Sequence, residues 1–414
     1  MKFLEELVLP NGTQIPNRIA KAAMEENMGD DDHAPSDELI RLYQQWAIGE
    51  VGLMITGNVM VDARAMTGPG GVVLENDRHL DRFKVWAQTA RAHGAQVWMQ
   101  INHPGRQTPG SLQQVAMAPS AIALDLGNLS KHFTVPREMT ATDIADVVSR
   151  FVNAAKLAEL AGFSGVQIHA AHGYLLSQFL SPLSNHRQDQ WGGSLANRAR
   201  LLLDIVKQVR ASVSASFVVA VKLNSADFQR GGFTQEDARQ VVKWLNDLQV
   251  DLVELSGGSY EAPAMQGIAR DGRTLAREAY FLEFAQDMLS IATMPLMVTG
   301  GIRSIEVVEQ VLASGVAMAG IATALAIEPH LPALWKRGEK KAPALPPIVW
   351  KNKALASLAN MAVVKFQLNR LSMGKLSTPT VSPVIAFLLQ QFNDAMKARR
   401  YRKWIVDQTT SGKN

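Results

Sequence analysis

Residues 168–198 read IHAAHGYLLSQFLSPLSNHRQDQWGGSLANR, a polar stretch between two apolar segments. The segment at 165–168 is short, mostly apolar and begins with glycine, which is typical of a buried strand. Residues 195–209 have the apolar spacing of an amphipathic helix. The connection between strand and helix is about two dozen residues long, and links of that length are usually functional or disordered. Because this one carries His, Tyr, Asn and Arg on an apolar background, we interpret it as functional.

Short apolar strands alternate with amphipathic helices over most of the chain. Strands are predicted at 18–24, 51–57, 96–102, 165–171, 217–223, 252–258, 295–301 and 318–324. Helices are predicted between them, at 36–49, 78–94, 142–161, 195–211, 234–248, 278–290 and 304–314. Apolar strands that alternate with helices form a parallel sheet covered on its outside. The eight units predict an α/β fold, a (β/α)8 TIM barrel. The alternative, a doubly wound sheet, would favour a GxGxxG turn after the first strand, and none occurs there.

Several predicted helices begin with residues that cap helix amino ends. The predicted capping residues are Ser36, Thr142, Thr234 and Ser304, each followed closely by an acidic residue.

The alternation of strands and helices stops after Pro346. Residues 352–372 and 382–405 are predicted to be helical. We therefore expect a barrel over 1–345 and a basic, helical C-terminal extension over 346–414. The longest insertion, 103–141, is rich in Pro, Gly and Ser and is interpreted as a loop over the barrel mouth.

The positive charge is concentrated near the C-terminus. Residues 351–414 hold 11 Lys and Arg against two acidic residues, a net charge of +9. Because the whole chain has a net charge of +4, the other 350 residues have a net charge of −5. The acidic barrel argues against nucleic acid as a partner. The basic extension is expected to be solvated, to lie on its own acidic barrel, or to form a homo-oligomer with a second copy. An anionic membrane surface is the least favoured partner.

The composition excludes several classes of protein. No run of 18 apolar residues occurs, so no membrane-spanning helix is expected, and the first residues do not resemble a signal peptide. The chain has no cysteine, which rules out disulfides, thiolate metal sites and a cysteine nucleophile. A cytoplasmic location is therefore expected.

Catalytic and binding residues of TIM barrels lie at the carboxyl ends of the strands. The unusual residues of this chain fall at those positions. They are Ala22, Ala23 and Met24 on the first strand, Gly57 on the second, Gln100 on the third, His169, His172 and Tyr174 on and after the fourth, Lys222 on the fifth, Gly300 and Gly301 on the seventh, and Ala322 and Thr323 on the eighth.

Two of these groups have alternative interpretations. Lys222 in a buried strand requires an anion, either a neighbouring carboxylate or a bound ligand. His169 and His172 could be metal ligands, a structural pair, or donors to a substrate oxygen with Tyr174 as proton donor. We favour the last, because two ligands alone do not make a metal site.

Gly300 and Gly301, followed by a helix, lie where these barrels bind phosphate.

The central stretch resembles the main motif of the Old Yellow Enzyme family of flavin-dependent ene-reductases. Four further segments support the resemblance in the family's order: PNRIAKAAM (16–24), MQINHPGRQ (99–107), VKLNSADFQRGGF (221–233) and VTGGIRS (298–304). The resemblance covers about residues 3–335.

The resemblance implies an FMN-binding barrel reduced by NADH or NADPH. Ala22, Ala23, Met24 and Gly57 would lie against the flavin, and Gln100 would bind its pyrimidine edge. Lys222 would stand beside N1, where most of the family has arginine. Gly300, Gly301, Ala322 and Thr323 would surround the phosphate. His169 and His172 would hold the carbonyl oxygen of an enone, hydride would pass from flavin N5, and Tyr174 would protonate the substrate.

Three residues depart from the family's pattern. Thr323 stands where an arginine usually contacts the phosphate, and Ala317 where aspartate is usual, so weaker FMN binding is expected. Glu25 replaces a small residue that often tunes the flavin. A carboxylate there would disfavour the anionic reduced flavin unless it points away or is protonated.

Three functions follow from these observations. The leading hypothesis is an FMN-dependent ene-reductase that acts on a small enone-type substrate. The alternative is a degenerate member with weak FMN binding that acts as a binding or scaffold protein. A metal-dependent lyase or hydrolase is disfavoured, because the two histidines lack a third ligand.

Overall fold

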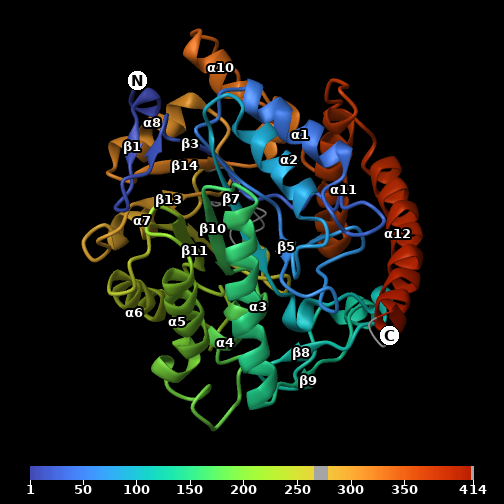
Figure 1. The fold of residues 1–414 in the computed structure, drawn as a ribbon. Helices are drawn as coiled ribbons and strands as arrows, with labels where there is room; N and C mark the ends of the chain where they lie inside the picture. The colour runs from blue at the N-terminus through green and yellow to red at the C-terminus, as the bar shows by residue number, and fades with distance from the viewer. Residues whose placement is uncertain (265–277, 412–414) are drawn as a thin grey trace.

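The computed structural model describes residues 1–264 and 278–411, and its centre is a closed parallel barrel (Figure 1). Its strands are β3 (Ile19–Lys21), β4 (Leu53–Ile55), β7 (Gln96–Asn102), β10 (Gly165–Ala170), β11 (Val218–Asn224), β12 (Leu252–Ser256), β13 (Leu296–Val298) and β14 (Met318–Ile321). Each pairs with the next, and β14 pairs with β3 to close the ring. The predicted (β/α)8 barrel is confirmed.

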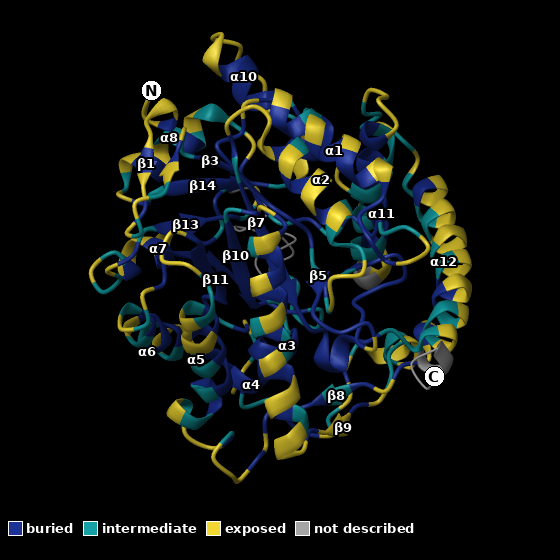
Figure 2. Ribbon diagram, viewed as in Figure 1, coloured by how far each residue is buried: buried dark blue, intermediate teal, exposed yellow. Residues whose placement is uncertain are grey.

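Helices cover the outside of the barrel, with apolar faces inward and exposed faces outward (Figure 2). They are α1 (Asp37–Ile48), α2 (Leu80–Arg91), α3 (Ala141–Leu160), α4 (Leu175–Leu180), α5 (Leu195–Ser212), α6 (Gln235–Asn246), α7 (Leu282–Met288), α8 (Ile305–Ala313), α9 (Thr323–Ile327) and α10 (Leu331–Lys336).

Two of the four predicted helix caps are confirmed. Ser36 and Thr234 accept backbone N–H groups at the amino ends of α1 and α6. The prediction of Thr142 is wrong, because α3 starts earlier and Thr140 forms a capping box with Asp143. Ser304 precedes α8, but its side chain accepts no capping hydrogen bond.

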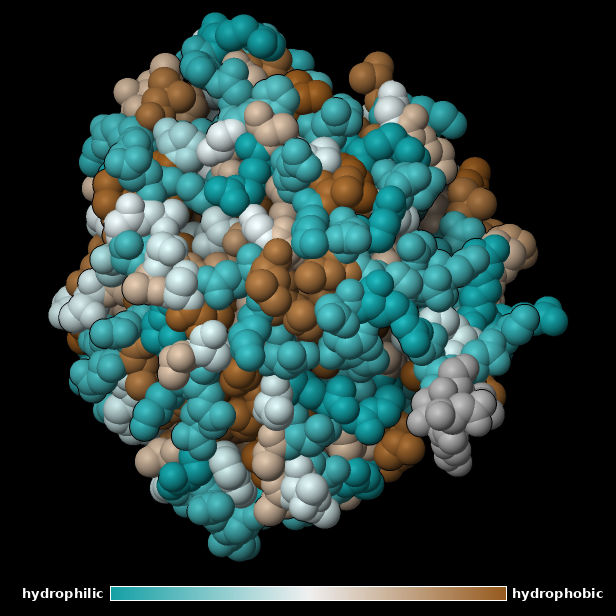
Figure 3. All heavy atoms as spheres, viewed as in Figure 1, coloured by the Kyte–Doolittle hydropathy of each residue, from teal (hydrophilic) through white to brown (hydrophobic). Residues whose placement is uncertain are grey.

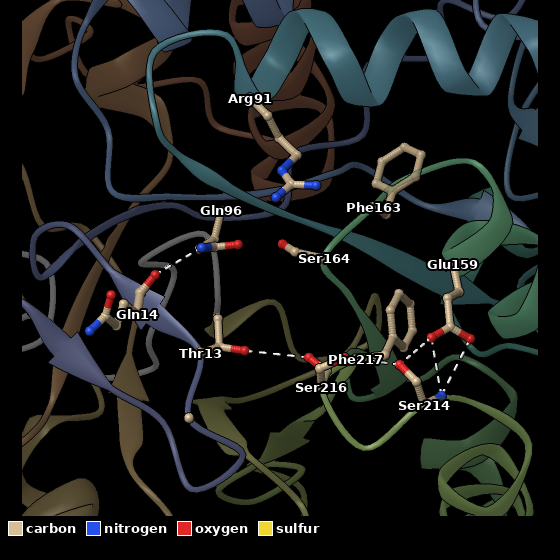
Figure 4. A pocket seen from close by; sticks show the side chains of 11 residues that line it. Thr13, Gln14, Arg91, Gln96, Glu159, Phe163, Ser164, Ser214, Ser216 and Phe217 are labelled. Carbon is tan, nitrogen blue, oxygen red and sulfur yellow. Dashed lines mark hydrogen bonds between the residues drawn. The ribbon is translucent and has the colours of Figure 1, made fainter.

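The amino-terminal end of the barrel is closed by apolar packing. The hairpin of β1 (Leu7–Val8) and β2 (Gln14–Ile15) lies there, and its buried Leu7 and Ile15 join a cluster with interior residues such as Trp98. A polar pocket of about 460 Å³ lies beside the hairpin. Figure 4 shows that the Glu159 carboxylate in this pocket already binds Ser214. This end of a barrel serves stability, and we assign the pocket no chemistry.

The loops at the opposite end contain more structure than predicted. The two short strands β5 (Val59–Met60) and β6 (Val72–Val73) extend the sheet beyond β7. The insertion predicted as a loop at 103–141 holds the paired strands β8 (Met117–Ala118) and β9 (Arg137–Glu138) and short 3-10 helices.

The C-terminal extension consists of α11 (Lys353–Ser372) and α12 (Pro383–Ser411), close to the predicted helices. Helix α11 packs against α1 and α9, and α12 packs against α11 at the right of Figure 1. Arg400 pairs with Asp31 at 2.9 Å, so the basic helix lies on its own chain.

The outer face of the first half of α12 is apolar and exposed, and brown spheres lie at the upper right edge of Figure 3. The exposed side chains are Val384, Ile385, Leu388, Leu389, Phe392 and Met396. The homo-oligomer through these helices stays a prediction. Across the described residues, no helix combines the length and the apolar character needed to cross a membrane.

Candidate functional site

Three neighbouring strands place charged and polar side chains side by side. In the parallel register His169 on β10 lies beside Lys222 on β11, and Lys222 lies beside Glu254 on β12. All three are buried, with relative exposures of 2%, 4% and 0%. His169 and Lys222 lie in the carboxyl halves of their strands and Glu254 at the middle of its strand, so the three line the barrel below its mouth.

A chain of polar side chains crosses the barrel interior. Lys222 Nζ lies 2.8 Å from Glu254 Oε1, and Glu254 Oε2 accepts a hydrogen bond of 2.7 Å from Gln167. Gln100 donates to Gln167 Oε1 at 2.7 Å. The internal ion pair considered for Lys222 is therefore present. This ion pair is enough to explain how a lysine is tolerated in a buried strand. It does not by itself show that Lys222 also binds a ligand.

The two histidines form one hydrogen-bonded pair. His169 Nε2 lies 3.1 Å from His172 Nδ1, and His169 Nδ1 lies 2.9 Å from Asn58 Oδ1. His172 Nε2 lies 2.7 Å from Ser256 Oγ. These contacts are consistent when His169 donates to Asn58, His172 donates to His169, and Ser256 donates to His172.

Burial lowers the pKa of both imidazoles well below the usual value, and the positive charge of Lys222 acts in the same direction. Both rings are therefore neutral near pH 7. His172 has a left-handed backbone with φ of 61°, and its N–H donates to Asn224 at 3.1 Å. Non-glycine residues held in this region often mark functional sites.

Tyr174 lies beside the pair with its hydroxyl directed at polar neighbours. The hydroxyl oxygen is 3.0 Å from that of Tyr260 and accepts a hydrogen bond of 3.4 Å from Asn58. Burial raises the pKa of Tyr174 well above its usual value, and the negative charge of Glu25 adds to the rise. The phenol therefore keeps its proton at neutral pH and is available as a donor.

The segment Ala22–Met24 follows β3 and runs beside β14, where Ala22 donates to Ile321 O at 2.9 Å. Gly57 lies close to this segment. A Cβ at Gly57 would lie 1.9 Å from Glu26 Oε2 and 2.2 Å from Met24 O, so only glycine fits. This contact could not be predicted from the sequence, because its partners lie in the loop that follows a different strand, β3.

Gly300 and Gly301 lie on the loop after β13. Ala322 follows the adjacent β14, and Thr323 is the first residue of α9. Gly300 and Gly301 have φ of 114° and 72°, which glycine adopts without strain. At the nearby amino end of α8, the Glu278 carboxylate accepts hydrogen bonds from Arg303 N, Ser304 N and Ser304 Oγ. That helix end therefore already holds an anionic group.

The polar residues of the site suit the flavin ring of FMN well and its phosphate group less well. A buried cation, an amide and paired neutral imidazoles suit the polar edge of a flavin. For the phosphate, left-handed glycine backbone is present, but Thr323 supplies a hydroxyl in place of a guanidinium. Across the described residues, no group of three or more His, Asp and Glu is placed to hold a metal ion.

The structure brings together His169, His172, Tyr174 and Lys222 as expected. Sequence reasoning missed their partners, which come from loops and strands far away along the chain. These are Asn58, Glu254, Ser256 and Tyr260. The sequence held one signal that could have found them. Asn58 directly follows the second predicted strand, and the other three lie on or just after the sixth, where barrel sites are built.

Comparisons with known proteins identify the family of the chain. The sequence profile of the NADH:flavin oxidoreductase / NADH oxidase family matches residues 7–341. The NADH-dependent flavin oxidoreductase iccE of Talaromyces variabilis is 38% identical over 359 residues, covering 80% of this chain and 86% of that protein. For the NADH-dependent flavin oxidoreductase iliE of a Neonectria species, the identity is 37%, covering 79% of this chain and 46% of that protein.

Among solved structures, the Old Yellow Enzyme homologue from Zymomonas mobilis superposes with a TM-score of 0.71 at 24% identity, covering 84% of this chain and 95% of that one. This likeness supports the barrel fold. Family membership implies FMN as the flavin and NADH or NADPH as the reductant. The chain belongs to the NADH:flavin oxidoreductase / NADH oxidase family and is a flavin-dependent oxidoreductase.

Proposed function

We propose that the protein reduces the activated C=C bond of an α,β-unsaturated carbonyl compound with reducing equivalents from NADH or NADPH. The observation that carries the proposal is the neutral pair His169 and His172 beside the protonated Tyr174. Neutral imidazoles can donate hydrogen bonds to a carbonyl oxygen, and a phenol with a raised pKa can donate a proton to carbon.

Each residue has a proposed role. Bound FMN would supply the hydride chemistry and would be held by Gln100, Lys222 and the segments Ala22–Met24, Gly300–Gly301 and Ala322–Thr323, with Gly57 beside it. The substrate oxygen would replace the mutual hydrogen bond of the two histidines, which joins His169 Nε2 and His172 Nδ1 at 3.1 Å. His172 would donate to it from Nδ1. His169 would donate from Nε2 with its proton moved there from Nδ1 and the Asn58 amide turned to donate to Nδ1. Asn58 and Ser256 would keep the rings oriented.

Absorbance spectroscopy under nitrogen tests the proposal. We expect the purified protein, supplied with FMN, to show flavin absorbance, to bleach with NADH or NADPH, and to recolour when an enone is added. Bleaching without recolouring by any of a panel of enones would leave a flavin oxidoreductase of another substrate class. A protein that takes up no FMN would exclude the mechanism.

The alternative is a member that binds FMN weakly and acts as a binding or scaffold protein. Two features of the phosphate end favour it: Thr323 is exposed and carries no charge, and Glu278 occupies the amino end of α8. The two histidines are hydrogen-bonded to each other, and Asn58 links His169 to Tyr174, which argues for retained chemistry.

Thr323→Arg is expected to tighten FMN binding at least about tenfold, worth about 1.4 kcal/mol. The arginine would restore a charged, bidentate phosphate contact. Fluorescence titration of the flavin measures the affinity, and riboflavin, which has no phosphate, is the matched ligand control. An equal gain for riboflavin, or no gain for FMN, would contradict a weakened phosphate site.

A further inference from the structure

The C-terminal extension reaches the edge of the candidate site through one asparagine. Asn27 lies in the loop that follows β3, three residues beyond Met24. Lys365 on α11 donates to Asn27 Oδ1, and Lys397 on α12 donates to Asn27 O at 2.6 Å. Two helices of the extension therefore hold the same residue. Asn27 has φ of 52°, a conformation that asparagine tolerates better than most residues.

Asn27 in turn holds the carboxylate of Glu25. Its side-chain amide donates to Glu25 Oε1 at 3.3 Å, and Thr67 Oγ1 donates to the same oxygen. The negative charge of Glu25 contributes to the raised pKa of both Tyr174 and Tyr260. The geometry places the carboxylate on the same side of the site as these phenols. The carbonyl of the preceding Met24 lies against Gly57, and Asn58, next to Gly57, donates to the Tyr174 hydroxyl.

Helix α12 also fixes the loop that carries Thr67. The Tyr401 hydroxyl donates to Ala63 O at 2.8 Å, and its ring packs with Met60 and Met66. A Cβ on Gly70, which has φ of 79°, would lie 2.8 Å from Lys397 Cδ, so the lysine stem lies against the glycine. Both loops that hold Glu25 are thus packed against the extension.

We propose that the C-terminal extension is a positioning element of the site, in which Lys365 and Lys397 fix Asn27, and Asn27 and Thr67 fix the Glu25 carboxylate beside Tyr174 and Tyr260. The carboxylate places negative charge at the mouth, which disfavours anionic electron acceptors relative to neutral ones. The effect on acceptor choice rests on the proposed function, whereas the contact network does not.

Hydrogen exchange tests the network without any assay of activity. The variant Lys365→Met/Lys397→Met keeps most of each apolar stem and removes both donors. We expect amide exchange at residues 24–30 and 63–71 to rise at least tenfold over the matched control Lys375→Met/Lys403→Met, whose lysines are exposed. Should the double variant not fold, Asn27→Asp serves instead, because it keeps both acceptor oxygens and repels Glu25. Unchanged exchange at residues 24–30 would overturn the network.

Acceptor selectivity tests the role of Glu25. The measured quantity is kcat/KM for an unsaturated carboxylate divided by kcat/KM for the methyl ester of the same skeleton. We expect Glu25→Gln to raise this ratio at least tenfold. The double lysine variant should also raise this ratio. The loss of two positive charges would by itself lower the ratio, because it weakens attraction for the anionic acceptor. A rise therefore reports a displaced Glu25.

The two effects must also be coupled. In the double lysine background, Glu25→Gln should change the ratio less than it does in the wild type, because Glu25 is already displaced. Additive effects, or an unchanged ratio in Glu25→Gln, would overturn the positioning role. If the wild type reduces neither acceptor, the proposed function fails while the exchange result still decides the network.

Discussion

Tyr174→Phe is expected to slow reduction of an enone by at least about 100-fold, a typical loss for a removed general acid. Reduction of the bound flavin by NADH or NADPH should change by less than about threefold, because hydride transfer requires no proton from this phenol. Stopped-flow absorbance separates the two half-reactions. Equal losses in both would contradict the proton-donor role and would indicate a structural defect.

Tyr260→Phe is the matched control for this experiment. It removes the hydroxyl 3.0 Å from that of Tyr174 but keeps the ring and the proposed donor. We expect a smaller loss in enone reduction than for Tyr174→Phe. Because burial holds the pKa of Tyr174 well above its usual value, the wild-type rate should not fall through loss of this proton between about pH 6 and 9. A fall with a midpoint in that range would contradict the assigned protonation state.

The sequence predicted the barrel because strand and helix periodicities are local signals. It also placed His169, His172 and Tyr174 together, since they are close in the chain, at the end of β10 and the start of the long connection after it. Neighbouring residues whose roles depend on the same loop are the easiest to predict from sequence.

Contacts that depend on closure of the barrel could not be predicted. Asn58 meets His169 from 111 residues away, and Glu254 meets Lys222 only because β11 and β12 are adjacent in register. The position of α12 on the barrel, and Glu278 at the amino end of α8, follow from packing that leaves no periodic trace. The misplaced cap at Thr142 has a local cause: Thr140 is an equally good capping residue two positions earlier.

Lys222→Met is expected to lower the free energy of unfolding by about 3–5 kcal/mol, as when one partner of a buried ion pair is removed. Glu254 would keep only its hydrogen bond from Gln167. The double variant Lys222→Met/Glu254→Gln should recover most of the loss, because no buried charge is left unpaired. Urea unfolding of the flavin-free proteins measures both changes. A single variant as stable as the wild type would contradict the burial and pairing of this lysine.

The same two variants separate the two roles considered for Lys222. If the lysine serves only to neutralise Glu254, the double variant should bind FMN as tightly as the wild type. If its cation also lies beside the flavin, as proposed, both variants should have a lower reduction potential for bound flavin, because the anionic reduced form loses its counter-charge. Lys21→Met/Glu26→Gln is the matched control, since it removes a second buried lysine–glutamate pair with Nζ and Oε1 at 3.0 Å. A larger potential shift in that control than in the Lys222 variants would place the electrostatic control of the flavin at β3 instead of β11.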